Sequence, residues 1–554
     1  MKKLFTLALV CILAFTSFAQ EPGEIDTNFG TDGVFVFHPS KVDKYGYFDY
    51  VYKILVQEDG KILTIGESRT DKMSYVIYIS RHNVDGTLDE TYGESGYVFL
   101  KVSDLVIKNC PYDAVLKDGK LYVAGYSYNG YNRGFILCLD ENGFANEDYG
   151  DKGWIVTEDG DKYGLVYEGI DIDSKGRCVV VGYYNDEIIV KRYNAKGKPD
   201  MTFGVDGVAS IELDPDPNTH SYAYDVKILD DGKIILCGDK RAGGEDGMFI
   251  WSYMMRLNSN GDRDNTFGEN GVVYLWTGEY AEFALSIDVQ PNGKYIVGGH
   301  DELWSDTPEL PRYESFVTRV NTDGTIDETF GEEGYVKIEP FQGDGCVNYS
   351  YSILAAPDGQ IFGTVYSRNI SEEVFRGYVY NLDENGQFNE NFAGSGIVPL
   401  PKVYEEQDEI NTYSIALQGN DKLIVAGYAA YDDPDEPGPG DYTKIYLTCV
   451  NVAVEGNGDN NEDDNNGNDT TGVVGNYENR FEIHPNPATT TIFIEGALND
   501  NAQVSIIDLT GRCVKEVVIS NTVSSINIED LESGVYFISV KQNENNYVEK
   551  LVIK

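Results

Sequence analysis

The chain has 554 residues, and its 92 acidic side chains against 43 lysines and arginines give a net charge of −49. This charge excludes nucleic-acid binding through a basic surface and membrane attachment through a polybasic patch, because both need an excess of Lys and Arg. Hydrophobic residues make up 41% of the sequence, which is enough apolar material for folded domains. The 59 glycines and 41 tyrosines favour many short strands joined by tight turns.

The N-terminus has the pattern of a secretory signal peptide over residues 1–19. Lys2 and Lys3 precede an apolar stretch, residues 4–15, and small residues then mark a cleavage site between Ala19 and Gln20. The apolar stretch is too short to span a bilayer, and no later run is long enough. We therefore expect a secreted protein without a transmembrane anchor.

A phrase of the form Asp-x-x-Phe/Tyr-Gly-x-x-Gly recurs along the chain, each time followed by an apolar strand. Its aromatic residue returns at intervals of 54 to 64 residues. In chain order the aromatic positions are Phe29, Tyr92, Tyr149, Phe203, Phe267, Phe330 and Phe392, the last in a degenerate copy. Seven copies near one period predict a repeat architecture over residues 20–454.

Each repeat also contains two predicted strands joined by a tight turn, which is Asp59-Gly60 in the first repeat. The later turns are Asp118-Gly119, Lys175-Gly176, Asp231-Gly232, Asn292-Gly293, Asp358-Gly359 and Asn420-Asp421. Asp-Gly and Asn-Gly supply the positive φ angles that two-residue hairpins need. Six residues after the second turn position a glycine follows in most repeats, Gly66 in the first, and such a glycine suits a bulge or a close backbone approach.

These patterns predict an all-β protein with four strands per repeat and 28 in the repeat region. Four-stranded units repeated radially give a β-propeller, here a seven-bladed one, followed by a small β-sandwich C-terminal domain. The last repeat lacks a final strand, whereas the chain begins with an extra one at residues 33–37. We expect this N-terminal strand to complete the seventh blade and close the ring, with an open solenoid as the alternative.

The repeated phrase at a period near 60 resembles the delta-60 repeat family of secreted β-propellers over residues 24–454. The resemblance implies the propeller fold and no particular activity, because it brings no common catalytic residues. The phrase itself has two interpretations. Its Asp caps a turn while the aromatic residue packs between blades, or Asp85, Asp89 and their equivalents bind Ca²⁺. Calcium is the one cofactor that the sequence suggests, although the loop lacks EF-hand spacing.

Residues 455–476 form a predicted linker. The stretch 455–471 contains only Gly, Asn, Asp, Glu and Thr, so it has no apolar side chain to bury. This composition is typical of an acidic disordered spacer.

Residues 477–554 regain the alternation of short strands and predict a small all-β module. The module resembles the type A C-terminal sorting domain of the type IX secretion system of Bacteroidetes-like bacteria. The residues that carry the resemblance are Pro485, Asn486, Pro487, Asp508, Gly511, Leu531, Gly534, Tyr536, Lys550 and Lys554. It implies export across the outer membrane to the cell surface or the medium, with the secretion machinery and its sortase as partners.

Eight cysteines are scattered at wide intervals without a CxxC pair, which predicts neither a disulfide framework nor a zinc site. Those within apolar strands are expected to be small buried hydrophobic residues, and one incidental disulfide stays open. Cys11 allows a lipoprotein signal as an alternative to the secretory one, although the bulky Val10 precedes it.

No catalytic or metal-binding motif is present, so the sequence identifies no catalytic residue and no metal ligand. We expect a cell-surface or secreted binding or scaffold module for a glycan or protein ligand. Tyrosine-rich loops such as residues 126–131 would present its contacts. The alternative is a secreted polysaccharide-degrading hydrolase or lyase with its site in the propeller channel.

Overall fold

The structure is a computed structural model, and within its described residues all regular structure is β-strand and none is helix. The chain divides into two compact parts, residues 1–458 and 459–554. The predicted signal peptide with its Ala19–Gln20 site and the predicted linker lie outside the described residues. The described residues are 21–39, 48–69, 74–103, 105–157, 164–213, 216, 218–244, 247–275, 281–303, 310–403, 409–431, 442–453, 482–484, 490–495, 502–508, 512–519, 523–528, 531, 534–542 and 545–553.

Strands of the first part pair antiparallel in sets, and each set, here called a strand unit, follows the chain order of one repeat. Unit 1 contains β2 (Asp49–Val56), β3 (Ile62–Arg69), β4 (Tyr75–His82) and β5 (Tyr97–Leu100). Unit 2 contains β6 (Lys108–Lys117), β7 (Lys120–Tyr128), β8 (Asn132–Leu139) and β9 (Trp154–Val156). Unit 3 contains β10 (Leu165–Ile172), β11 (Cys178–Tyr184), β12 (Glu187–Tyr193) and β13 (Val208–Ile211).

The remaining units follow the same plan. Unit 4 contains β14 (Thr219–Ile228), β15 (Ile234–Gly244), β16 (Gly247–Leu257) and β17 (Val272–Tyr274). Unit 5 contains β18 (Ala281–Val289), β19 (Tyr295–Leu303), β20 (Arg312–Val320) and β21 (Tyr335–Ile338). Unit 6 contains β22 (Cys346–Tyr349), β23 (Ile353–Ala355), β24 (Ile361–Asn369), β25 (Val374–Leu382) and β26 (Ile397–Pro399). Unit 7 contains β27 (Glu409–Gln418), β28 (Lys422–Tyr431), β29 (Tyr442–Asn451) and the N-terminal β1 (Val34–Phe37).

The first strand of a unit carries a β-bulge opposite a glycine of the second strand. In unit 1 the pairing shifts between Val51 and Lys53, directly beside Gly66. A Cβ atom on Gly66 would lie 1.9 Å from the carbonyl oxygen of Tyr50, so only glycine allows this approach. The predicted role of this glycine is confirmed. Unit 6 has Val365 at the corresponding position, and there the first strand is broken into β22 and β23, so this repeat departs from the expected four strands.

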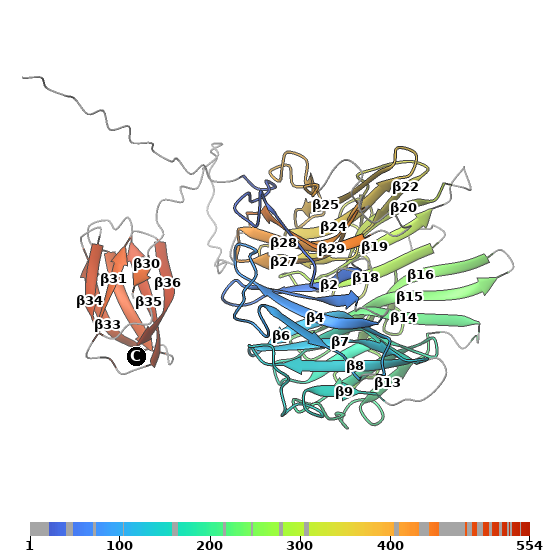
Figure 1. The fold of residues 1–554 in the computed structure, drawn as a ribbon, viewed down its shortest axis with the longest axis horizontal. Coiled ribbons are helices and arrows are strands. Elements are labelled where there is room, and N and C mark those ends of the chain that lie inside the picture. The colour runs from blue at the N-terminus through green and yellow to red at the C-terminus, as the bar shows by residue number, and fades with distance from the viewer. Residues whose placement is uncertain are drawn as a thin grey trace, which may run out of the picture. The chain divides into compact units, whose positions relative to one another are not determined.

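The two ends of the repeat region meet. β1 pairs antiparallel with β29, which confirms that the N-terminal strand completes the last unit. Figure 1 shows β27 and β28 of unit 7 beside β2 of unit 1, and one core cluster joins Ile54 and Ile62 to Ile424 and Leu447. Such a closed arrangement leaves no unpaired sheet edge between the first and last repeats.

The second part contains two antiparallel sheets. One is formed by β30 (Glu482–His484), β31 (Thr491–Glu495) and β34 (Val523–Asn527). The other is formed by β33 (Cys513–Ile519), β32 (Ala502–Asp508), β35 (Gly534–Gln542) and β36 (Asn545–Ile553). Side chains of both sheets share one hydrophobic core, in which Ile492 and Ile526 pack with Ile506 and Ile538.

Candidate functional site

The bulged residue of each first strand occupies the same place in every strand unit. The register shifts leave one residue without a partner at this position in six units, and residue 351 lies in the corresponding gap between β22 and β23. These residues, here called the channel ring, are Tyr52, Tyr112, Glu168, Tyr224, Leu285, Tyr351 and Tyr413. All seven are half-buried, although their neighbours Val51, Ala223 and Ala284 are buried completely. First strands surround the axis of a propeller, so we assign the channel ring to the wall of the axial channel.

Tyrosines of the channel ring touch across unit boundaries. The ring centroids of Tyr52 and Tyr112 are 5.4 Å apart, those of Tyr52 and Tyr413 are 6.2 Å apart, and those of Tyr351 and Tyr413 are 4.8 Å apart. These spacings fall within the range of favourable aromatic pairs. Four units thus contribute to one continuous aromatic wall.

Further aromatic residues extend this wall toward unit 5. His300 lies 4.7 Å from Tyr349 and 5.0 Å from Phe283, measured between ring centroids. Burial lowers the pKa of His300 to about 3, so this imidazole is neutral and adds an aromatic face rather than a charge.

Two buried carboxylates hold tyrosine hydroxyls of the channel ring. Glu67 accepts a hydrogen bond from the Tyr52 hydroxyl at 3.0 Å, and Lys108 lies 3.5 Å from the same oxygen. Asp239 accepts one from the Tyr224 hydroxyl at 2.6 Å, and Arg241 pairs with it at 2.7 Å. Burial raises the pKa of both carboxyls, although these partners act in the opposite direction. The partners fix both tyrosines in place.

Glu168 differs from these two carboxylates. Among the residues that the structure describes, no donor lies within hydrogen-bond distance of its carboxylate oxygens, and no cation pairs with it. Burial raises the pKa of Glu168 to about 8. A carboxyl group that is half-buried and unpaired in a channel is typical of a functional site.

Near the channel ring, polar side chains link several first strands to the first strand of the next unit. Asp113 accepts a hydrogen bond from the Ile170 N–H at 3.0 Å, and Asp225 accepts one from the Ile287 N–H at 2.9 Å. Ser414 of unit 7 accepts one from the Ile54 N–H of unit 1 at 3.1 Å. These side chains therefore satisfy backbone donors that the bulges release from the sheet.

Residues of the repeated phrase form contacts between neighbouring units. The end of each unit that carries this phrase is here called the turn side. In unit 5, the Arg319 Nε lies 2.7 Å from Asp327 Oδ2, and its guanidinium stacks 4.7 Å from the centroid of the Phe330 ring. A second cation, Lys294, lies 2.6 Å from the same oxygen. Equivalent arginine pairs join Arg81 to Asp89, Arg192 to Asp200 and Arg256 to Asp264.

These pairs bear on the calcium interpretation of the repeated phrase. The aspartates at its first position bind guanidinium and ammonium groups of their own chain where a Ca²⁺ ion would need them. The described residues contain no group of three or more His, Cys, Asp or Glu side chains that could hold a metal ion. The geometry therefore assigns these aspartates to the contacts between units.

Residues 126–131, the predicted tyrosine-rich loop, lie partly in a strand. Tyr126 and Tyr128 belong to β7, so the expectation of a loop is wrong for both. Tyr126 packs 5.5 Å from Tyr112 of the channel ring, whereas Tyr128 is 40% exposed. The channel ring itself was not foreseen, and only an alignment of the repeats on their turn glycines could have indicated it.

Six cysteines have described side chains, and all six are buried and free, as expected for small hydrophobic residues. Of the sorting-domain residues, Asp508 ends β32, Gly534 and Tyr536 lie on β35, and Lys550 lies on β36. Tyr536 is in the core, and Leu531 packs against it. Outside the described residues lie Pro485, Asn486, Pro487, Gly511 and Lys554.

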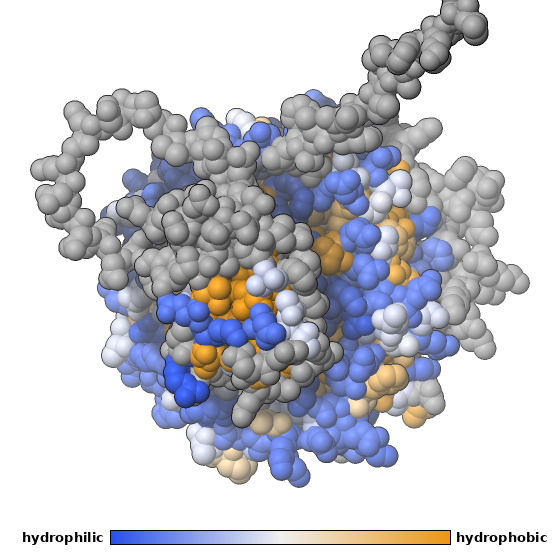
Figure 2. All heavy atoms as spheres, turned by 90° about the vertical axis from the view of Figure 1, so that its left-hand side faces the viewer, coloured by the Kyte–Doolittle hydropathy of each residue, from blue (hydrophilic) through white to orange (hydrophobic). Residues whose placement is uncertain are grey.

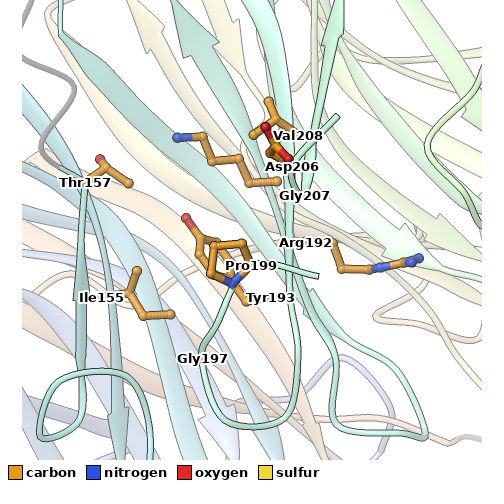
Figure 3. Close-up of a pocket in the computed structure, with 10 residues that line it drawn as sticks. Ile155, Thr157, Arg192, Tyr193, Gly197, Pro199, Asp206, Gly207 and Val208 are labelled. Atoms are coloured by element: carbon orange, nitrogen blue, oxygen red, sulfur yellow. The ribbon is translucent and has the colours of Figure 1, made fainter. Parts of the chain in front are cut away.

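A cavity of about 310 Å³ lies where the outer strands of units 2 and 3 meet (Figure 3). Its lining includes Thr157 from unit 2 and Arg192 and Tyr193 from unit 3. The Thr157 hydroxyl donates to the Gly134 carbonyl, and Arg192 is paired with Asp200. These two polar groups are therefore already engaged in contacts within the protein. They are less available to a ligand than the Glu168 carboxyl of the channel ring, which is unpaired among the described residues.

The face of the molecule in Figure 2 is mainly hydrophilic over its described surface, in keeping with the net charge of −49. Among the described residues, the structure contains no helix that is long and apolar enough to cross a membrane.

Comparison with known families supports both halves of this description. Residues 482–554 match the family described as secretion system C-terminal sorting domain. Residues 57–92, 116–145 and 290–330 match the family described as domain of unknown function (DUF5122) beta-propeller, which is the delta-60 repeat family. No curated protein matches the chain.

Several solved structures share similarity at low identity. A protein of unknown function from Dyadobacter fermentans is 11% identical over 76% of this chain and 98% of its own, with a TM-score of 0.39. A protein from Lactobacillus plantarum is 13% identical over 71% and 98%, with a TM-score of 0.37. The β-propeller domain of the Trilobed protease from Pyrococcus furiosus is 10% identical over 72% and 98%, with a TM-score of 0.34.

The chain therefore combines DUF5122 β-propeller repeats with a C-terminal sorting domain of the type IX secretion system, which directs it to the cell surface or the extracellular space.

Proposed function

We propose that this protein is an exported binding module whose ligand binds at the channel ring of a closed, seven-bladed propeller. The observation that carries the proposal is the combination of touching tyrosines, Tyr52, Tyr112, Tyr351 and Tyr413, with the unpaired carboxyl of Glu168. Aromatic faces with one free polar group are the usual lining of small-molecule and glycan sites.

Export is expected to remove both ends of the chain. Cleavage after Ala19 would leave Gln20 as the new N-terminus, and a sortase would remove the module at residues 477–554 after transport. The intact mass and N-terminal sequence of the protein recovered from the medium or the cell surface would test both sites. A mature chain that retains residues 1–19 would contradict the first step, and one that retains residues 477–554 would contradict the second.

Binding is tested by applying the purified mature chain to arrays of glycans and peptides. The variant Tyr351→Leu/Tyr413→Leu should lose the binding, because it removes two faces that stack at 4.8 Å. The matched control is Tyr128→Leu, at a tyrosine that is 40% exposed and outside the channel ring. A blank result for every ligand class, or equal binding by both variants, would contradict a channel site.

A hydrolase is the second candidate, and the raised pKa of Glu168 favours it, since a general acid needs a carboxyl that keeps its proton near neutral pH. Glycoside hydrolysis uses a second carboxylate as well, and the two carboxylates that anchor ring tyrosines, Glu67 and Asp239, are engaged by tyrosines and cations. Polysaccharide degradation that Glu168→Gln abolishes would establish this alternative.

A further inference from the structure

We infer that the channel ring binds an alkylammonium group, with tyrosine faces around the cation and the Glu168 carboxylate as its counter-ion. This inference rests on the proposed function and names the chemistry of its ligand. The first support is geometric. Five of the seven ring positions are tyrosines, and a cation within about 6 Å of such ring faces is attracted by their quadrupoles.

The pairing of neighbouring carboxylates provides the second support. Glu67 has Lys108 as a counter-ion and Asp239 has Arg241. Glu409 accepts hydrogen bonds from the Tyr366 hydroxyl and the Asn411 amide. Glu168, in contrast, has no donor or cation among the described residues, so its side chain is the one in this wall whose partner the fold does not supply. A ligand cation would supply that partner, and because a neighbouring positive charge favours the ionised form, its binding would release the proton that Glu168 holds near neutral pH in the free channel.

The same conclusion follows from the tyrosine hydroxyls. Those of Tyr52 and Tyr224 already donate to Glu67 and Asp239, so neither can donate to a ligand; the Tyr224 oxygen also accepts from Arg241, whereas the Tyr52 oxygen can still accept. Acceptor oxygens and ring faces suit an N–H donor that carries positive charge. A neutral sugar would need donors as well as acceptors from the protein, and these two hydroxyls have none left to give.

The charge around the site has the right sign for a cation. One or three residues after the ring positions on the first strands, Lys53 and Lys227 are outnumbered by Asp113, Asp171, Asp225 and Asp288. Lys53 pairs with Asp113 at 2.7 Å, and Lys227 lies 3.9 Å from Asp288. Residues 20–454 as a whole hold 75 acidic and 35 basic side chains, which gives a net charge of −40. This field attracts cations and repels anionic glycans and nucleic acids.

The alkylammonium group has two possible sources, a lysine side chain of a peptide and a free polyamine. The test is calorimetric titration of the purified mature chain with N-acetyl-lysine amide and with spermidine, each against the neutral N-acetyl-glutamine amide. We expect at least one amine to bind and the neutral compound to bind at least tenfold more weakly. Binding by the lysine derivative alone indicates a peptide ligand, and binding by spermidine alone indicates a polyamine.

Variants separate the two contributions. Glu168→Gln should weaken amine binding at least tenfold, whereas Glu269→Gln, an exposed carboxylate on the turn side, should leave it unchanged. Tyr112→Phe, in the unit next to that of Glu168, keeps the ring face and should bind, while Tyr112→Leu should not, and this pair decides the question should Glu168→Gln misfold. Equal amine binding by wild type and both loss variants would overturn the inference. A glycan that binds the channel ring when no amine does would overturn it too, yet would leave the proposed function standing, and the absence of any ligand would overturn both.

Discussion

The turn side of the strand units and the channel ring both contain carboxylates that are at least half-buried, but the two regions treat this group in opposite ways. On the turn side, Asp327 has Arg319 at 2.7 Å and Lys294 at 2.6 Å, and although burial acts against it, Lys294 and Thr329 hold the pKa of Asp327 below its usual range. In the channel ring, Glu168 has no such partner within the described part of the chain, and burial raises its pKa to about 8. The paired arrangement recurs from unit to unit, whereas Glu168 is the one carboxylate among the seven residues of the channel ring. The repeated residues thus hold the units together, and the position that varies between repeats is free to bind a ligand.

The largest effect should come from the aromatic residue of the repeated phrase. Phe267 is completely buried under the Arg256 guanidinium, 4.5 Å from its ring centroid, and beside Tyr295. Phe267→Ala should lower the free energy of unfolding by about 3–5 kcal/mol, because it leaves a cavity between units. Urea unfolding of the mature chain measures this. The control Val205→Ala, at a side chain that is 77% exposed, should change it by less than about 0.5 kcal/mol, and similar values for both would contradict a packing role.

Loss of the arginine should be the next largest effect. Arg319→Met keeps much of the side-chain volume but leaves Asp327 with Lys294 as its only ion-pair partner among the described residues and frees the carbonyl of Glu384, to which Arg319 donates. We expect a loss of about 2–4 kcal/mol, since removing one partner exposes the desolvation cost of the other. Lys294→Met, at a side chain that is 31% exposed, should cost less than about 1 kcal/mol. A larger loss for the lysine variant would reverse this ranking.

Acid should weaken the turn side first. Asp89, Asp264 and Asp327 all have a lowered pKa in the folded chain, so their stabilisation is complete above the unfolded value near 4 and is lost as the pH falls below it. Unfolding midpoints between pH 6 and pH 3 should therefore fall. Asp327→Asn should be less stable than wild type at pH 6, and the difference should shrink by about 1 kcal/mol or more toward pH 3. A constant difference would show that the charge of Asp327 contributes nothing.

The same comparison explains which features the sequence could predict. Asp59-Gly60 and Gly66 fix local backbone geometry, so the hairpins and the bulge could be predicted from local residues, and the spare strand near the N-terminus predicted its pairing with β29. The channel ring could not, because a bulge changes which side chain points to the axis and its members lie about 60 residues apart in sequence. Nor does the sequence show that Glu67 pairs with Lys108 while Glu168 has no cation partner among the residues that the structure describes.

The smallest effect is also the one of opposite sign. Because the pKa of Glu168 is raised to about 8, the folded chain bears a penalty for ionising this carboxyl, and the penalty grows as the pH rises from the unfolded value near 4.5 through 8. Glu168→Gln removes the penalty. It should therefore stabilise the chain by about 1 kcal/mol at pH 9, with little change at pH 5, the magnitude being limited by channel water. Paired melting curves at the two pH values test this, and equal shifts at both would contradict it. We therefore expect Asp327→Asn to destabilise the fold and Glu168→Gln to stabilise it, although both substitutions replace a carboxylate by its amide. A residue whose replacement stabilises the fold while abolishing binding is retained for its ligand.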